Sequence, residues 1–184
     1  MINSNVPCRL EGKVALITGA ARGLGECTAR LFAKHGAKVV IADIVDDLGE
    51  AVSKTLPDST YVHCDVTNES DVQNAVDTVV SKYGKLDIMF NNAGLCDGNK
   101  DIRENELSDF TRIVSVNLTG VFLGTKCNNP IFLKTYFPHK NKKISKTLPR
   151  AQIDMGQISI HRPVTGFIKS DEIQFEKNIS KINS

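Results

Sequence analysis

A turn with three glycines, spaced Gly-x-x-x-Gly-x-Gly, stands between an apolar run and a helical pattern near the start of the chain. The apolar run is Val14–Thr18. Glycine lets the backbone turn sharply and approach a bound group closely, and the amides at a helix N-terminus attract negative charge. The turn therefore predicts a site for a pyrophosphate group. The residues assigned to this site are Gly19, Arg22, Gly23, Leu24 and Gly25.

A carboxylate follows the second apolar run and bears on the kind of nucleotide. Asp43 stands 18 residues after Gly25. A carboxylate about 20 residues beyond such a turn accepts hydrogen bonds from the adenosine ribose and repels a 2′-phosphate. The position favours NAD over NADP, although Arg22 is able to neutralise a 2′-phosphate. The alternative interpretation is a solvated loop aspartate beside Asp46 and Asp47.

Apolar runs alternate with helical patterns through the first part of the chain. We expect strands at 14–18, 38–42, 60–64 and 87–90, and helices at 24–36, 46–54, 67–84 and 107–124. Successive β-α-β units of this kind form a parallel sheet. The sequence thus predicts an α/β fold, the N-terminal half of a doubly wound, Rossmann-type parallel sheet. Thr67 is the expected N-cap of the third helix, and Gly36 and Gly84 are expected to end helices as left-handed residues.

The ordered motifs resemble those of the short-chain dehydrogenase/reductase family from about Leu10 to Lys126. They are Thr18 to Gly25, Asp43, Cys64-Asp65-Val66, Asn91-Asn92-Ala93-Gly94 and Val116-Asn117. Residues 9–19 and 92–96 look most like the plant secondary-metabolism branch, which includes secoisolariciresinol, xanthoxin and zerumbone-type alcohol dehydrogenases. The resemblance implies an NAD-dependent oxidoreductase that acts on a small secondary alcohol or ketone.

The resemblance also implies roles for individual residues. Asp65 would bind the adenine amino group and Val66 would contact the ring. Asn91 would tie the fourth strand to its neighbours. The residues that would line the adenosine side are Asn92, Ala93 and Gly94.

Asn117 matches the helix asparagine that holds a water in the proton relay of this family. It shares a helical face with Phe110, Val114 and Val121, so an amide interrupts an apolar stripe. A buried amide needs hydrogen-bond partners. A plain structural hydrogen bond is therefore an equally supported role for Asn117.

Three further catalytic groups of the family lack credible counterparts. These are a Ser, a Tyr that acts as general acid and base, and a Lys four residues later that lowers the Tyr pKa. The pair Tyr136 and Lys140 has the spacing, but it follows Asn117 by only 19 residues. Pro138 lies between the two and disfavours the helix that would align them. We interpret this pair as fortuitous.

The composition changes at about residue 126. Residues 1–126 contain 13 basic and 17 acidic side chains, and residues 127–184 contain 10 basic and 4 acidic ones. We therefore divide the chain into an NAD-binding half-domain, 1–126, and a divergent basic tail, 127–184, that we expect to be irregular. The tail's basic cluster comprises Lys140, Lys142, Lys143, Lys146 and Arg150. It lacks an aromatic stacking platform, so we do not expect a nucleic-acid partner.

Other features exclude several classes of protein. The longest apolar run is far below the roughly 20 residues that span a bilayer, and no apolar signal peptide precedes Arg9, so we expect a cytoplasmic protein without a membrane partner. The cysteines are scattered singly, without metal-ligand spacing, and we expect reduced thiols and no metal. They are Cys8, Cys27, Cys64, Cys96 and Cys127. We interpret the four histidines as ordinary surface or core residues.

Three interpretations of function remain open. The chain is an NAD-dependent dehydrogenase by family, or a catalytically silent NAD-binding protein that pairs with a full-length relative. The third is a truncated product, in which the tail rich in Ile, Lys, Asn and Ser arises from a translated intron or a frameshift. Without the second half, we expect an unpaired edge at the fourth strand, an incomplete family homo-oligomer interface, and a tendency to aggregate.

Overall fold

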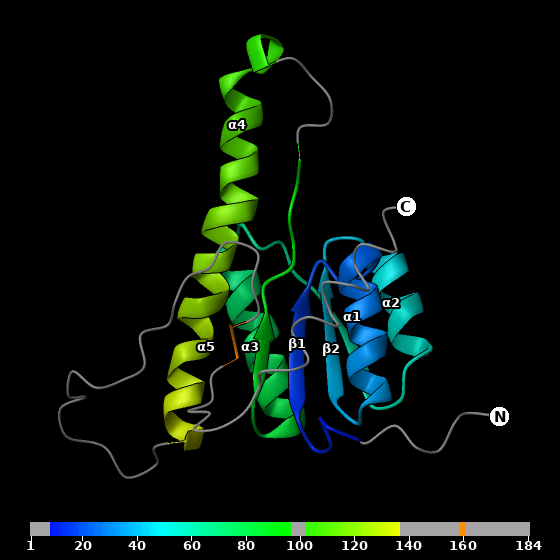
Figure 1. Cartoon of the computed structure of the whole chain (residues 1–184). Helices are drawn as coiled ribbons and strands as arrows, with labels where there is room; N and C mark the ends of the chain where they lie inside the picture. Colours follow the sequence, from blue (N-terminus) through cyan, green and yellow to red (C-terminus); the bar gives the residue numbers. More distant parts are fainter. Residues whose placement is uncertain (1–7, 97–101, 137–158, 161–184) are drawn as a thin grey trace, which may run out of the picture.

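Four parallel strands form the centre of the computed structural model, which describes residues 8–96, 102–136 and 159–160 (Figure 1). Their order in the sheet is β3-β2-β1-β4. Val14 pairs with Lys38 across β1 and β2, and Ala15 pairs with Ile88 across β1 and β4. The bounds are Val14–Thr18 for β1, Lys38–Asp43 for β2, Ser59–His63 for β3 and Ile88–Phe90 for β4. This arrangement confirms the predicted doubly wound α/β fold.

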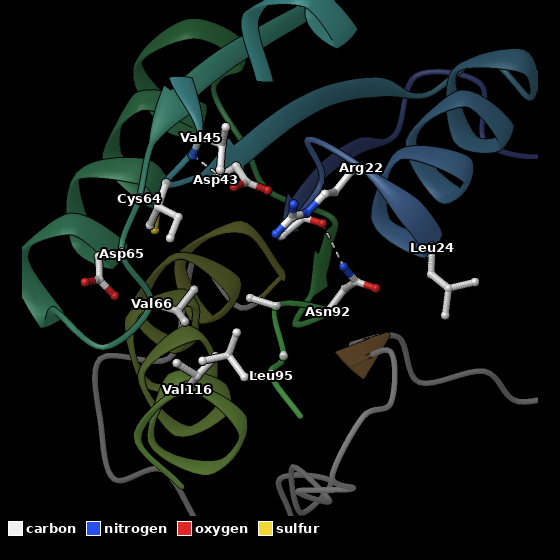
Figure 2. Close-up of a pocket in the computed structure, with 14 residues that line it drawn as sticks. Arg22, Leu24, Asp43, Val45, Cys64, Asp65, Val66, Asn92, Leu95 and Val116 are labelled. Carbon is white, nitrogen blue, oxygen red and sulfur yellow. Dashed lines mark hydrogen bonds between the residues drawn. The ribbon is translucent and has the colours of Figure 1, made fainter. Parts of the chain in front are cut away.

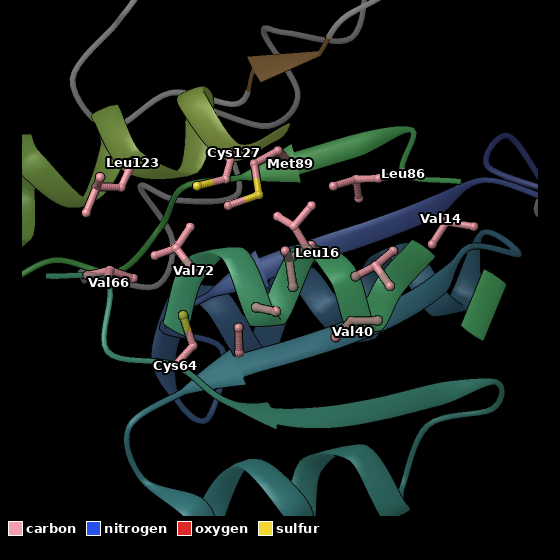
Figure 3. Packing of buried hydrophobic residues seen from close by; sticks show 14 residues of the cluster. Val14, Leu16, Val40, Cys64, Val66, Val72, Leu86, Met89, Leu123 and Cys127 are labelled. Atoms are coloured by element: carbon pink, nitrogen blue, oxygen red, sulfur yellow. The ribbon is translucent and has the colours of Figure 1, made fainter. Parts of the chain in front are cut away.

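Helices cover both faces of the sheet. They are α1 (Gly23–Lys34), α2 (Asp46–Lys54), α3 (Glu69–Tyr83) and α5 (Gly120–Tyr136). Leu16 and Val40 belong to the core cluster with α3 and α5, which Figure 3 shows, whereas Ile17 and Ile41 face α1 and α2. Because successive side chains of a strand point to opposite faces, both faces need apolar residues. That requirement explains why the strands read as continuous apolar runs.

The ends of α3 depart from expectation at one position. Asn68, not Thr67, is the N-cap, since its side chain accepts a hydrogen bond from the Ser70 amide at 3.0 Å. The Thr67 hydroxyl is occupied by Asp65, to which it donates at 2.8 Å. The predicted end of the helix is confirmed: Gly84 has a φ of 75°, a left-handed conformation that glycine adopts without strain.

The last helix is longer than predicted. After a short 3₁₀ turn, η1 (Ile102–Glu104), the helix α4 (Leu107–Val114) passes through a π-helical turn, η2 (Ser115–Thr119), into α5. Our expected end near Gly124 is wrong, because the helix continues to Tyr136 and buries Cys127 and Asn128 against the sheet and α3. An irregular tail therefore does not begin at residue 127.

A short strand lies beside β4, where we expected an unpaired edge. This strand, β5 (Ser159–Ile160), runs antiparallel to β4 and pairs with Met89 and Ile88. The expectation of an open edge is thus wrong for these two positions. The tail's basic cluster, which includes Lys140, lies outside the described residues.

An apolar row is exposed along the long helix. Leu107 is 78% exposed and Phe110 61%, and Leu118 and Phe122 are also exposed. No residue of α4 is buried, and Figure 1 shows the helix projecting beyond the sheet. Phe110 therefore does not lie on a buried stripe with Asn117 as expected, because the sheet does not extend to α4 and no residue of α4 is buried. Contiguous exposed apolar surface promotes association.

The row provides a test of the expected aggregation. Replacing two of its members, Phe110→Glu and Phe122→Glu, is expected to lower light scattering of the full chain at equal concentration. Ser108→Glu, an exposed change on the same helix, serves as the control and is expected to have a much smaller effect. Equal scattering by the unvaried chain, the variant with both Phe substitutions and the Ser108→Glu control would contradict a role for this row.

Candidate dinucleotide-binding site

A cleft of about 340 Å³ opens at the carboxyl ends of the strands (Figure 2). Nine of the predicted residues line it: Gly19, Arg22, Leu24, Asp43, Asp65, Val66, Asn92, Ala93 and Gly94. Five residues that we did not assign also line it: Ile44, Val45, Cys64, Leu95 and Val116. Four of these five are adjacent in sequence to a predicted site residue, and Val45 lies two residues from Asp43, so proximity along the chain was the available signal. In open α/β sheets this edge is where ligands bind.

The glycine turn packs against the loop after β4 at backbone contact. Gly19 has a φ of 63°, and a Cβ there would lie 2.8 Å from the Ala93 Cα. A Cβ on Gly25 would collide with the Gly19 carbonyl and the Asn92 amide. Helix α1 then begins at Gly23 without a side-chain hydrogen bond from its N-cap, Arg22. Uncapped amides at the start of a helix fit the anion that we predicted.

Asn92 and Thr18 fasten this turn to the loop. The Asn92 Nδ2 donates to the carbonyl oxygens of Thr18 and Gly19 at 2.9 and 3.1 Å. The Thr18 Oγ1 accepts from the backbone amides of Asn92 and Ala93 at 3.0 and 3.1 Å. The Asn92 side-chain amide thus fixes the glycine turn, a contact that we did not predict. Thr18, for which we predicted no such contact, shares this role.

Asp43 is held by the backbone on both of its carboxylate oxygens. Its Oδ2 accepts from the Ala21 amide at 2.9 Å, and its Oδ1 accepts from the Val45 amide at 3.0 Å. The residue is 9% exposed and lines the cleft. A carboxylate has about four acceptor sites, so capacity remains for two further donors. Two adjacent hydroxyl groups of a ribose fit that capacity.

The opposite wall is largely apolar. Val66 packs against the helix at Gly120, where a Cβ would lie 2.8 Å from the Val66 Cγ2. Burial raises the pKa of the Cys64 thiol to about 12, so this wall carries no charge from Cys64 at neutral pH. Asp65 uses its Oδ1 on the Thr67 backbone amide and hydroxyl. In the predicted hydrogen bond from an adenine amino group, Oδ2 of Asp65 would therefore be the acceptor.

Asn117 lies in the π turn and anchors the loop after β4. Its Nδ2 donates to the Leu95 carbonyl at 2.8 Å, and its Oδ1 accepts from the Leu95 amide at 2.7 Å. The side chain thus makes the structural hydrogen bond that we kept as one alternative, and its place in a proton relay stays a prediction. Asn91 is buried, but its Nδ2 has no partner among the described residues.

Tyr136 is placed far from this cleft by the length of the helix. The backbone is continuously helical from Leu107 to Tyr136. Nineteen residues separate it from Asn117, which corresponds to about 28 Å at a rise of about 1.5 Å per residue. Its predicted exclusion from the site is consistent with this placement. Its partner in the fortuitous pair, Lys140, lies outside the described residues.

Two features are absent from the described part of the chain. No group of three or more His, Cys, Asp or Glu side chains there has an arrangement suited to a metal ion. Within the same residues, no helix combines the length and apolar character needed to cross a membrane.

The comparison with protein families agrees with this geometry. The model described as short chain dehydrogenase matches residues 13–136. The chain belongs to this family. The match continues ten residues past Lys126, the point where the resemblance seemed to stop, and ends with α5. The helix and the family similarity therefore share their last residue.

Plant enzymes are among the curated proteins that are similar to this chain. A secoisolariciresinol dehydrogenase of Forsythia intermedia is 63% identical over 121 residues, which are 64% of this chain and 44% of that protein. A mitochondrial borneol dehydrogenase of Lavandula x intermedia is 65% identical over 124 residues, 67% and 48% of the two chains. A zerumbone synthase of Zingiber zerumbet is 54% identical over 123 residues, 64% and 46%. The chain thus spans less than half the length of these relatives.

A solved structure shares the same half of the fold. The 3-ketoacyl-(acyl-carrier-protein) reductase of Brucella melitensis, complexed with NADH, has 45% sequence identity and a TM-score of 0.67. The alignment covers 68% of this chain and 52% of the reductase.

The close approach of Gly19 to Ala93 can be tested by a pair of glycine substitutions. Gly19→Ala is expected to lower the free energy of unfolding by more than the about 1–2 kcal/mol that a left-handed alanine costs, because its Cβ also overlaps the loop. Gly12→Ala is the matched control, since Gly12 has a φ of 68° but no atom within 4 Å of its Cβ position. Urea denaturation measures both, and equal losses would contradict the steric argument.

Proposed function

We propose that this chain binds NAD in the cleft, with the pyrophosphate on the glycine turn and the adenosine ribose on Asp43. The observation that carries the proposal is the Asp43 carboxylate, fixed by the Ala21 and Val45 amides and directed into the cleft. The proposal is supported further by the solved reductase of similar fold, which is complexed with NADH.

The charge of Asp43 is the reason to propose NAD rather than NADP. The 2′-phosphate of NADP would meet a carboxylate whose position two backbone amides fix, so it could not turn aside. Arg22 is exposed at the mouth of the cleft and offers a positive charge. An exposed cation is screened by water and salt, whereas like charges in contact inside a cleft are not. We therefore propose that the repulsion by Asp43 outweighs the attraction by Arg22.

By family, the reaction in which the bound cofactor takes part is hydride transfer with a small secondary alcohol or ketone. The described residues contribute the binding of the adenosine half, the anchor at Asn117 and an apolar wall. We propose that the chain by itself does not complete the reaction, since we find no credible counterparts for the Ser, Tyr and Lys of the family. The position of Tyr136 at the far end of the helix supports this interpretation.

A second candidate is a silent NAD-binding protein that pairs with a full-length relative. The exposed apolar row of Leu107, Phe110, Leu118 and Phe122 favours it, because such a surface on a helix is suited to bury against another chain. NAD binding without turnover is common to this candidate and to an inactive monomer. Co-purification with a full-length relative would distinguish the two.

Replacing Asp43, the carboxylate proposed to bind the adenosine ribose, tests the cofactor assignment. Asp43→Ala is expected to weaken NADH binding about 10- to 100-fold, the range for hydrogen bonds to a charged group. The same change is expected to reduce the difference in binding affinity between NADH and NADPH. Asp47→Ala removes an exposed carboxylate four residues away and serves as the control. Fluorescence titration with both cofactors measures the effect, and an unchanged NADH affinity would remove the proposed role of Asp43.

Turnover provides a separate test of activity. With saturating NAD and small secondary alcohols, the full chain is expected to produce no NADH above the rate of a blank, because the acid and base groups are missing. Absorbance of NADH measures this rate directly. If NADH is formed, Tyr136→Phe becomes informative: loss of turnover in that variant would overturn the interpretation of Tyr136 as fortuitous.

A further inference from the structure

A hydrogen-bonded cluster contacts the backbone of Asp43, the residue proposed to bind the adenosine ribose. The Tyr61 hydroxyl, from β3, lies 2.8 Å from the backbone carbonyl oxygen of Asp43 and 2.5 Å from the Oδ1 of Asp46. The His63 Nδ1 lies 2.7 Å from the same oxygen of Asp46. Asp43 is the last residue of β2, and Asp46 is the first residue of α2. The cluster therefore joins both ends of the turn that enters the cleft.

The aromatic ring of Tyr61 is seated where it can hold this position. It lies over Gly49 of α2, and a Cβ on Gly49 would collide with the ring carbons. The ring also packs against the core cluster on the α1 and α2 side of the sheet. Burial, followed by the hydrogen bond to Asp46, raises the pKa of Tyr61. The hydroxyl thus keeps its proton and acts as a donor at neutral pH.

The turn itself has little packing of its own. It consists of Ile44 and Val45, both of which line the cleft, and Ile44 is 61% exposed. With little apolar burial, the position of the turn depends on its two ends. One end is the Asp43 carbonyl, which accepts from the Cys64 amide at 3.0 Å and shares the single hydrogen of the Tyr61 hydroxyl with Asp46. The other end is Asp46, which Tyr61 and His63 hold.

The charges around His63 make the cluster sensitive to pH. The groups that act on it are Asp46 on α2, Asp71 on α3 and Asp65 in the loop after β3. The hydrogen bond to Asp46 raises the pKa of His63 above its ordinary value of 6.5. Hydrogen bonds from Tyr61 and His63 lower the pKa of Asp46. The charged pair is therefore complete below the ordinary pKa of His63, and it is lost as the pH rises through the raised pKa of His63.

We propose that Tyr61, Asp46 and His63 are positioning residues that hold the Asp43 turn in the geometry that binds the adenosine ribose. The inference rests on the proposed binding of NAD and extends it to residues that do not touch the cofactor. The network makes affinity for the adenosine half depend on the protonation of His63. Affinity is then higher with His63 charged than with His63 neutral.

Three variants of the full chain test the proposal. Tyr61→Phe keeps the ring over Gly49 and removes only the hydroxyl, and His63→Gln removes the titrating group. Asp47→Asn, in the same first turn of α2, is the matched control. Binding of NADH, 5′-AMP and nicotinamide mononucleotide is measured at about pH 6 and about pH 8, together with the thermal unfolding midpoint.

The expected results separate positioning from general stability. Tyr61→Phe weakens the binding of NADH and of 5′-AMP by the same factor, about threefold to tenfold. It leaves the binding of nicotinamide mononucleotide unchanged. The unvaried chain binds NADH, whose pyrophosphate does not titrate in this range, more weakly at the higher pH, and His63→Gln abolishes that difference. Equal weakening of both mononucleotides, or a pH difference that persists in His63→Gln, would overturn the proposal.

Hydrogen exchange distinguishes this proposal from the proposed function. Without any ligand, the backbone amides of residues 44–47 are expected to exchange faster in Tyr61→Phe than in the unvaried chain or in Asp47→Asn. If the unvaried chain binds no NADH, the proposed function fails, and exchange at these amides still decides whether the network holds the turn. Unchanged exchange in Tyr61→Phe would overturn the positioning role.

Discussion

The contact between Gly19 and Ala93 is the constraint on which the cleft depends. Two backbone segments, one after β1 and one after β4, meet there with no side chain between them. Asn92 and Thr18 close the contact with four hydrogen bonds between the same two segments. As a result the start of α1 and the loop that carries Leu95 stand at a fixed distance. The Asn117 anchor then extends this rigidity to the long helix.

The fold of residues 10–126 follows from patterns that act over short distances. Val14–Thr18 and Lys38–Asp43 read as buried strands because both faces of the sheet are covered, and glycine at 36 and 84 ends helices by its conformation. The Rossmann-type order and most of the cleft followed from these elements. The N-cap of α3 did not, since Thr67 and Asn68 are both suitable residues and only the competing bond to Asp65 decides between them.

Features that depend on contacts between distant residues could not be predicted. Residues 127–136 lack the alanine and glycine of the preceding segment, yet Cys127 and Asn128 are buried, so packing against the sheet and α3 prevails over composition. The π turn around Asn117 has no simple sequence signal, and the exposure of Phe110 follows from the projection of α4 beyond the sheet, which the helical pattern does not reveal. Tyr61 and His63 gave no motif because their partner, Asp46, is distant in sequence.

The thiol of Cys64 has a consequence for how the cleft moves. Its side chain is buried in the cleft wall, and its raised pKa keeps it protonated at neutral pH. Because thiolates are the species that react with alkylating agents, Cys64 is inert while the wall is closed. Alkylation then requires a transient opening of the segment between β3 and α3. The rate at which Cys64 is alkylated therefore measures how often this segment opens. A ligand that contacts both walls of the cleft would lower that rate.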